Sequence, residues 1–375
     1  MGGAERKLRV CYFGTFSPQD ARHRINVAGL RAAGAQVFVC NRPLWRDTQD
    51  RVGAASGGWA RPAFWGRALW RYAGLVFAFV RLPTPDVIVV GYPGPVDVLV
   101  ARLLARRGTP IVWDVLMSLQ LIAAERGLDR SAPWTYRALR AVERFAAAHC
   151  NRLLCDTPEY ARWLQESLPV PAERCRLLPL GSDWTELYAP LPTTRFTVLY
   201  HGSFIPNHGV EFILEAAAAL RDEPDIEFVL VGRGPQRADL ERTARGAGNV
   251  TFLAWQHGDA LRRRVAGADV CLGAFGVTKQ SLITIHNKIL EALALGRAVI
   301  TGDSPPVRRQ FTHGEHLYIC ARADGAAIAT AVRTLHGDAA FRQRLQENGR
   351  RLVAEKYSAA QIGRTLYGHL RELSP

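Results

Sequence analysis

Short apolar runs alternate with longer amphipathic stretches along the whole chain. The stretches between the runs, such as 210–224 and 235–248, carry apolar residues at helical spacing. Continuous apolar strands separated by helices are typical of parallel sheets that are covered on both faces. The series occurs twice, so the pattern predicts an α/β protein with two doubly wound domains. We expect strands at 8–13, 35–40, 86–90, 110–114, 152–156, 176–180, 196–201, 226–231, 249–254, 269–275, 297–301 and 316–320.

A segment rich in Pro, Gly and other turn-forming residues separates the two series, at 178–195. A chain of 375 residues also fits two domains of ordinary size. We therefore expect an amino-terminal domain at 1–185 and a second domain at 186–345. The charged helical tail at 346–375 is expected to cross back to the first domain.

Composition narrows the class of partner. The net charge is 48 − 34 = +14, which favours anionic partners: nucleic acid, an acidic membrane surface or phosphorylated small molecules. Seven cysteines show no C-x-x-C spacing, which indicates reduced thiols and neither a disulfide frame nor a zinc site. The first residues lack the apolar run of a signal peptide, and no run is long enough to span a membrane. These features predict a cytoplasmic protein.

Glycine-rich turns follow three of the expected strands. Gly14 follows the first strand, Gly202 and Ser203 follow the strand at 196–201, and Arg233 lies in the turn after 226–231. Each turn can be an ordinary connection, but glycines allow a ligand to approach the backbone, and the amides of a following helix can bind an anion. Two such turns on neighbouring strands open on the same edge of a sheet, which favours a binding site there.

The stretch TIHNKILEALALGRAVITGDSPP, residues 284–306, predicts a helix at 285–295 that ends at Gly296. Lys288 and Glu291 are three residues apart and share one face of this helix. They form either a surface ion pair or part of a site. The helix is otherwise almost wholly apolar, and charges on a buried helix need partners or a ligand. We favour a ligand with both phosphate and hydroxyl groups, the lysine binding the anion and the carboxylate accepting from the hydroxyls.

Five segments in order carry a resemblance to a known family. The second half resembles the donor domain of family 4 glycosyltransferases, which have the GT-B fold of two Rossmann-like domains facing across a cleft. The first half is similar to the acceptor domain more loosely, through 89–97, 111–118 and 155–164. The segments of the second half are YHGSFIPNHGVEFILEAAAAL, FVLVGRGP, NVTFLAWQ, ADVCLGAFG and HNKILEALALGRAVITGDSP, within 196–320.

The resemblance implies a retaining, metal-independent glycosyltransferase that needs no cofactor. A nucleotide-sugar would be the donor, and the acceptor would be a lipid-linked or cell-surface glycan. Glu291 matches the second glutamate of the family's motif of two glutamates separated by seven residues and would bind the ribose, whereas Ile283 occupies the place of the first. The residues implied around the donor are Gly14, Gly202, Ser203, His208, Arg233, Lys279, Asn287, Lys288 and Glu291.

Catalysis would rest on cations and amides that stabilise the departing diphosphate. The family's usual Arg and Lys are replaced here by Ser203 and His208, so the charge of the diphosphate must be neutralised by other cations. Lys288, Lys279 and Arg233 are the available cations. Asp114, at the end of the strand 110–114, is the best carboxylate to face the cleft from the first domain. It can bind the acceptor or cap a turn, and these interpretations have equal weight.

The segment 59–82 interleaves aromatic and basic residues before an apolar run. Trp59, Trp65 and Trp70 alternate with Arg61, Arg67 and Arg71. We rank a buried helix pair first, contact with an anionic membrane second, and stacking on single-stranded nucleic acid last. We expect no nucleic-acid partner. Two alternatives to the enzyme remain: a degenerate, non-catalytic nucleotide-binding member of the fold, and a basic nucleic-acid-binding protein.

Overall fold

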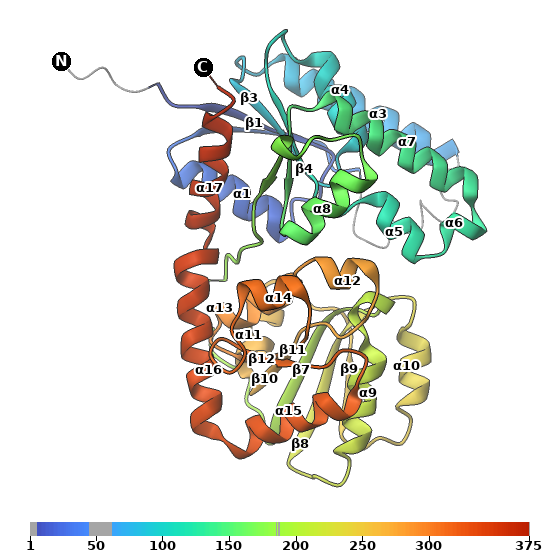
Figure 1. Ribbon diagram of the computed structural model, residues 1–375, viewed down its shortest axis with the longest axis vertical. Coiled ribbons are helices and arrows are strands. Elements are labelled where there is room, and N and C mark those ends of the chain that lie inside the picture. Colours follow the sequence, from blue (N-terminus) through green and yellow to red (C-terminus); the bar gives the residue numbers. More distant parts are fainter. Residues whose placement is uncertain (1–5, 45–61, 185, 187, 375) are drawn as a thin grey trace, which may run out of the picture. The chain divides into compact units, whose positions relative to one another are not determined.

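The computed structural model describes residues 6–44, 62–184, 186 and 188–374. The chain forms two compact units, residues 1–179 with 359–375 and residues 180–358. Each unit is built on a six-stranded sheet in which all paired strands are parallel (Figure 1). All twelve segments expected as strands form strands, so the prediction of parallel sheets between helices is confirmed.

The sheet of the first unit has the strand order β2-β1-β3-β4-β5-β6. Its strands are β1 (Arg9–Gly14), β2 (Gln36–Asn41), β3 (Val87–Val90), β4 (Ile111–Asp114), β5 (Arg152–Cys155) and β6 (Cys175–Leu177). Its helices are α1 (Ala21–Ala32), α3 (Pro62–Val80), α4 (Pro95–Leu104), α5 (Leu119–Glu125), α6 (Leu128–Ser131), α7 (Pro133–His149), α8 (Pro158–Ser167), the 3₁₀ turn η2 (Ala172–Arg174) and α17 (Ala359–Arg371).

Alternate residues of the first sheet face two helical layers, as the strand period requires. On one face, β1 and β3 pack against Ile25 and Leu30 of α1 and Ile362 of α17. Helices α1 and α17 cross closely at two glycines, Gly29 and Gly363, where an added Cβ would meet backbone atoms of the other helix. On the other face, helix α3 contributes Phe79, whose ring packs edge-on against the ring of Phe13 in β1.

The sheet of the second unit has the order β12-β11-β10-β7-β8-β9. Its strands are β7 (Phe196–Ser203), β8 (Ile226–Arg233), β9 (Val250–Leu253), β10 (Val270–Leu272), β11 (Ala298–Gly302) and β12 (Tyr318–Cys320). Its helices are η3 (Pro206–His208), α9 (Val210–Ala219), α10 (Arg237–Thr243), α11 (Gly258–Gly267), α12 (Lys279–Ile283), α13 (Asn287–Ala294), α14 (Pro305–Gln310), α15 (Gly325–Gly337), α16 (Ala339–Leu352) and the π-helical turn η4 (Val353–Tyr357).

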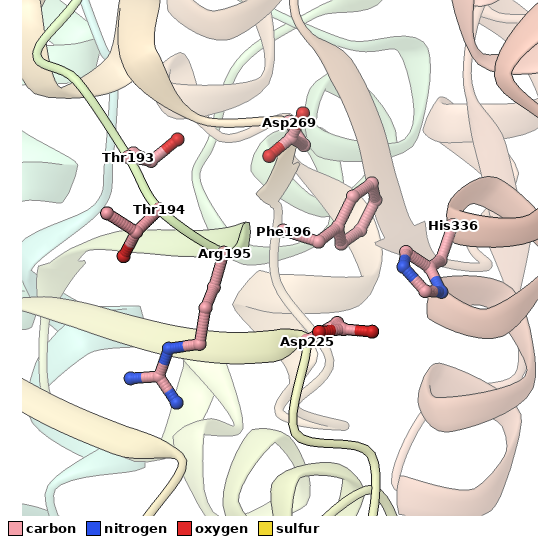
Figure 2. A pocket seen from close by; sticks show the side chains of 7 residues that line it. All are labelled: Thr193, Thr194, Arg195, Phe196, Asp225, Asp269 and His336. Atoms are coloured by element: carbon pink, nitrogen blue, oxygen red, sulfur yellow. The ribbon is translucent and has the colours of Figure 1, made fainter.

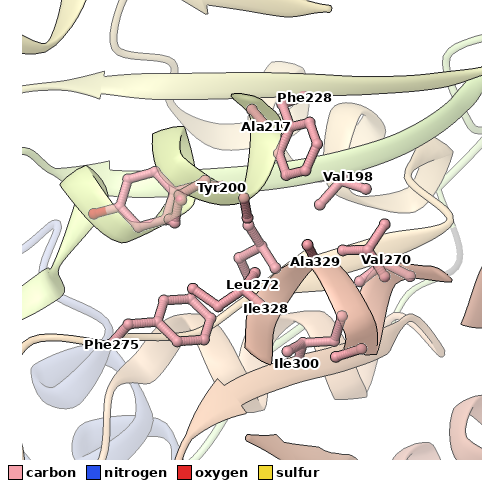
Figure 3. Close-up of a cluster of buried hydrophobic side chains, with 14 of the residues drawn as sticks. Val198, Tyr200, Ala217, Phe228, Val270, Leu272, Phe275, Ile300, Ile328 and Ala329 are labelled. Atoms are coloured by element: carbon pink, nitrogen blue, oxygen red, sulfur yellow. The ribbon is translucent and has the colours of Figure 1, made fainter. Parts of the chain in front are cut away.

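The core of the second unit lies between its sheet and helices α9 and α15. Figure 3 shows Val198, Tyr200 and Leu272 of the strands close to Ile328 and Ala329 of α15. All five are at least 98% buried. The hydroxyl of Tyr200 donates to the Ser203 carbonyl oxygen over 2.8 Å, so this ring ties the apolar core to the turn that follows β7.

Candidate functional site

The carboxyl edge of the second sheet brings together the two glycine-rich turns. Strands β7 and β8 are paired up to their last residues, with Gly202 opposite Gly232 and Ser203 opposite Arg233. Because the strands are parallel, the turns that follow them open on the same edge, which is where doubly wound sheets bind ligands. Gly202, Ser203 and Arg233 are therefore neighbours at one mouth of the sheet.

Lys288 lies at this edge, in the first turn of α13, and it is buried to 7% exposure. Its Nζ lies 3.3 Å from Nδ1 of His208 and 4.0 Å from the centre of the Tyr200 ring. The chain has four lysines, and the other three, Lys7, Lys279 and Lys356, are exposed. Burial lowers the pKa of Lys288 well below its usual 10.5, and only partial compensation comes from Glu291.

Gly202 makes room for the Lys288 amine. Its φ is +149°, which side chains rarely adopt, and an added Cβ would lie 2.6 Å from Lys288 Nζ. A normal contact between such atoms is at least about 3.4 Å, so any side chain here would displace the amine. The glycine after β7 thus allows a cation to lie directly against the end of the strand.

Three histidines surround the amine. His201 lies near the end of β7, His208 ends η3, and His286 is the N-cap residue of α13. The ring centres of His208 and His286 are 5.1 Å apart. Burial lowers the pKa of His201 to about 3 and lowers the pKa values of His208 and His286 well below 6.5, and the charge of Lys288 lowers all three further. The histidines are therefore neutral at neutral pH. An anion bound at Lys288 would raise all these pKa values.

Glu291 lies beside His201, one turn after Lys288 on α13. Its Oε2 is 4.0 Å from His201 Nε2. That Nε2 is buried and has no hydrogen-bond partner among the residues that the structure describes. His201 is fixed by stacking on Trp184, which carries the guanidinium of Arg262 on its ring. A ligand hydroxyl between the carboxylate and the ring nitrogen would give that nitrogen a hydrogen-bond partner.

The other predicted residues of this unit lie around the same edge in less constrained positions. Asn287 is half-buried at the start of α13, and Lys279 is exposed at the start of α12. The Arg233 guanidinium lies 5.3 Å from the centre of the Trp255 ring. Ile283, at the end of α12, is 7% exposed and so is an apolar part of the interior.

Asp114 in the first unit corrects the expectation of a carboxylate that faces an acceptor. Its side chain is fully buried and binds the Arg22 guanidinium through Nε and Nη2, at 2.9 Å each. Asn26 Nδ2 also donates to it, at 2.9 Å. Arg22 is equally buried and its Nη1 donates to the carbonyl oxygens of Leu178 and Pro179. Opposite charges buried in an apolar interior pair with each other, so neither group is available to a ligand here.

Gly14 ends β1, and the turn after it is held by a buried carboxylate. An added Cβ on Gly14 would lie 2.8 Å from Oδ2 of Asp97. The same Oδ2 accepts from the Thr15 backbone N–H over 2.8 Å, and Oδ1 accepts from the Tyr72 hydroxyl over 2.8 Å. The glycine turn is thus tied to helix α3.

The segment 59–82 is not a buried helix pair. The described part is the single helix α3, of which only Ala68, Leu75 and Phe79 are buried. Trp65 and Trp70 are 58% and 77% exposed. Trp59 and Arg61 lie outside the described residues. The first-ranked interpretation is therefore wrong, because the segment has more apolar faces than one helix can bury in this domain.

Sequence patterns missed several residues of the edge. His201, His286 and Trp184 were not singled out. His201 directly precedes Gly202 and His286 directly precedes Asn287, and both of those neighbours were predicted. Arg322 was missed as well: its Nη1 donates to the Gly276 carbonyl and to Ser281 Oγ over 2.7 and 2.8 Å. Burial lowers the pKa of Arg322 to about 10. No local signal marks Arg322, since it reaches the edge from the end of β12.

A shallow depression of about 390 Å³ also marks the second unit (Figure 2). Phe196 begins β7, and Asp225 and Asp269 directly precede β8 and β10. The depression therefore lies at the amino ends of the strands, opposite to the edge that holds Lys288. Its full lining is Thr193, Thr194, Arg195, Phe196, Asp225, Asp269 and His336. Doubly wound sheets bind ligands at the carboxyl ends, so we do not assign the site here.

No group of three or more His, Cys, Asp or Glu side chains in the described part of the chain has the geometry to hold a metal ion. No helix within the described ranges is long and apolar enough to cross a membrane.

Comparison with known proteins agrees with this architecture. The model of glycosyl transferases group 1 matches residues 195–338, and the model of the glycosyl transferase 4-like domain matches residues 24–181. The chain is 27% identical to alpha-D-kanosaminyltransferase of Streptomyces kanamyceticus, over 95% of this chain and 86% of the relative.

Two solved structures share the fold over nearly all of the chain. Sucrose-phosphate synthase from Thermosynechococcus elongatus superposes with a TM-score of 0.71 at 18% identity, covering 98% of this chain and 99% of that one. HepE from Anabaena, in complex with UDP-glucose, superposes with a TM-score of 0.68 at 15% identity, covering 98% of this chain and 99% of that one.

The two six-stranded parallel sheets and the matches to both glycosyl transferase models identify a glycosyltransferase of the GT-B fold. The chain belongs to the family 4 glycosyltransferases, also called glycosyl transferases group 1.

Proposed function

We propose that the carboxyl edge of the second sheet binds the nucleotide-sugar donor. Lys288 and the backbone around Gly202 and Ser203 would bind the diphosphate, while Glu291 with His201 would bind the ribose hydroxyls. The observation that carries the proposal is the burial of Lys288 among three neutral histidines, which leaves at the mouth of the sheet a buried amine that Glu291 compensates only in part. HepE, which shares the fold, is described with bound UDP-glucose, and this supports the same class of ligand.

The remaining predicted residues surround this centre. His208 would pack beside the Lys288 amine and hold the turn after β7, since its Nδ1 lies 2.7 Å from the Ser203 carbonyl oxygen. Arg233, Lys279 and Asn287 would contact the donor from the flanking turns, and Gly14 would belong to the turn that closes over it. We leave Asp114 out of the catalytic set because its carboxylate is used by Arg22 and Asn26.

We propose a retaining, metal-independent reaction. The bond between the anomeric carbon and the diphosphate oxygen breaks, the acceptor oxygen forms the new bond, and its proton leaves to solvent or to the diphosphate. Negative charge grows on the departing diphosphate, and Lys288 with the nearby amides would stabilise that charge without reorganisation. Activity in the presence of EDTA and the anomeric configuration of the product, read by proton NMR, test these two points.

Calorimetry on three lysine and glutamate variants tests the donor site. A thermal-shift screen with UDP, GDP and ADP selects the nucleotide. Lys288→Ala should lower the affinity for both that nucleotide and inorganic pyrophosphate about ten- to hundred-fold, as expected for a lost charge-assisted contact. Glu291→Ala should lower the affinity for the nucleotide but leave the affinity for pyrophosphate unchanged, because only the nucleotide carries ribose hydroxyls. Lys356→Ala, at an exposed lysine of the same unit, is the matched control. Unchanged nucleotide affinity in both site variants would contradict the assignment of the donor site.

For the acceptor, we propose a lipid-linked or cell-surface glycan that the enzyme meets at an anionic membrane through the segment 59–82. The exposed tryptophans of α3 support this contact. Transfer of radiolabelled sugar to extracted lipid-linked glycans, compared with transfer to free sugars, tests the class of acceptor. Equal rates for both would contradict the lipid-linked class.

A further inference from the structure

Exposed apolar side chains are gathered on one part of the first unit. Among the described residues, twelve large apolar side chains are exposed, and nine of them belong to α3, α4 and α7. The second unit exposes one, Val277. The nine are Trp65, Leu69, Trp70, Phe77, Val80, Val96, Leu103, Trp134 and Phe145. Scattered exposed apolar residues are normal, but such a concentration indicates a contact surface.

The three helices are neighbours in one layer. Helix α4 packs against both α3 and α7, and the three ribbons run side by side in the first unit (Figure 1). On each helix the exposed residues share a face. Val96 and Leu103 are seven residues apart on α4, and Trp134 and Phe145 are eleven apart on α7, which are two and three helical turns. We call this set the three-helix surface.

Helix α3 has two apolar sides where a packed surface helix needs one. Its buried side, with Leu75 and Phe79, covers the sheet. Its outer side carries Leu69, Trp70 and Val80 at 65% to 77% exposure. None of the described residues buries the outer side, so we treat it as a candidate contact surface.

The charges of the three-helix surface have one sign. Six arginines lie on the three helices: Arg67, Arg71, Arg102, Arg137, Arg140 and Arg144. The same helices hold two acidic residues, Asp97 and Glu143, and both are 1% exposed. Asp97 accepts from Thr15 and Tyr72, while Glu143 accepts from the Ser118 hydroxyl over 2.7 Å. Both carboxylates are thus buried. Arg137, Arg140 and Arg144 of α7 are exposed and the other three arginines are half-buried, so the charges that these helices expose are cationic.

Aromatic rings and guanidinium groups meet on this face. The Arg137 guanidinium lies 5.2 Å from the centre of the Trp134 ring on α7. At the end of α3, that of Arg81 lies 3.8 Å from the centre of the Phe77 ring. Such pairs keep the cation at the level of the ring, at the boundary between an apolar and a polar phase.

We propose that the three-helix surface binds an anionic lipid bilayer. Tryptophan rings favour the headgroup level, aliphatic side chains enter the acyl boundary, and arginines pair with anionic headgroups. Single-stranded nucleic acid fits less well, since Leu69, Val80 and Leu103 offer no ring on which a base can stack. The proposal extends the membrane contact proposed above from one segment to three helices. It is independent of donor binding.

Flotation with lipid vesicles tests it. The full chain is mixed with vesicles of phosphatidylcholine alone or of an equal mixture with phosphatidylglycerol. We expect binding to the mixed vesicles, and at least about ten-fold less bound protein for the double variant Trp65→Ala with Trp70→Ala. Arg137→Glu with Arg140→Glu should remove the preference for phosphatidylglycerol. Val277→Ala, which removes the exposed apolar residue of the other unit, should bind like the wild type.

Three results would overturn the proposal. These are equal binding to both kinds of vesicle, loss of binding in Val277→Ala equal to that in the tryptophan variant, and tight, salt-sensitive binding to a single-stranded oligonucleotide in place of vesicles. Nucleotide affinity of the tryptophan variant, measured by calorimetry, should be unchanged. That measurement separates failure of the membrane proposal from failure of the donor site and shows that the variant is folded.

Discussion

Nζ of Lys288 lies 3.3 Å from Nδ1 of His208. Lys288 keeps its proton only at lower pH than an exposed lysine, because burial lowers its pKa well below 10.5. A bound diphosphate favours the ammonium form and raises that pKa, so binding takes up a proton wherever the free site is neutral. Nucleotide affinity should therefore fall as pH rises through the lowered pKa of Lys288. Calorimetry in buffers of different ionisation enthalpy measures this uptake directly.

Lys288→Ala is the control for this pH dependence. Its nucleotide affinity should be weak and nearly independent of pH over the same range. A slope as steep as that of the wild type would assign the proton to another group.

Gly202→Ala should weaken nucleotide binding about ten-fold or more, since its Cβ would lie 2.6 Å from Lys288 Nζ and must displace the amine. Gly246→Ala is a matched control, because Gly246 also has a positive φ, +83°, but an added Cβ there meets nothing within 4 Å. Both variants carry backbone strain, and only the first should lose affinity in calorimetry. Equal losses would show that strain, and not the site, is responsible.

Asp114→Asn should lower the free energy of unfolding by about 3 kcal/mol or more, because it leaves the buried guanidinium of Arg22 without its carboxylate. Urea denaturation measures this change. Glu223→Gln breaks the partly exposed pair with Arg333 and should cost under about 1 kcal/mol. If Asp114→Asn is as stable as the wild type but transfers no sugar, the residue acts on the acceptor after all.

Acid should destabilise the fold through its buried histidines. Burial lowers the pKa of His23 to about 4 and that of His201 to about 3, whereas both are near 6.5 in the unfolded chain. Below pH 6.5 the unfolded chain binds protons that the folded one does not. Stability is therefore lost as pH falls, by about 1 kcal/mol per pH unit for each histidine down to about pH 4.

Urea denaturation of the double variant His23→Gln with His201→Gln checks this linkage. Its free energy of unfolding should depend less steeply on pH between about 6 and about 4 than that of the wild type. An equal slope would show that other groups dominate.

Much of the fold followed from local pattern, whereas contacts between distant residues did not. Apolar runs become strands because burial on both faces of a parallel sheet demands them, and Lys288 and Glu291 share a face because helical spacing requires it. The partnership of Arg22 with Asp114 spans 92 positions and depends on strand pairing, which sequence spacing does not encode. The same holds for Arg322, which reaches the site from another strand.

Helix α3 shows a different limit. Its apolar residues were visible in the sequence, but how many of them the domain buries depends on what packs against them. A pattern with more apolar positions than one buried face can use predicts either a second helix or an outside partner. Only the exposure of Trp65 and Trp70 decides between these.

The cations on α3, α4 and α7 are all arginines. A guanidinium keeps its proton at any pH at which the protein is folded, and it is not a substrate for lysine acetylation. The proposed donor site instead relies on Lys288, whose pKa burial lowers well below 10.5. On the two proposals made above, alkaline conditions would stop sugar transfer while leaving the protein bound to an anionic bilayer, so location and activity would respond to different chemical signals.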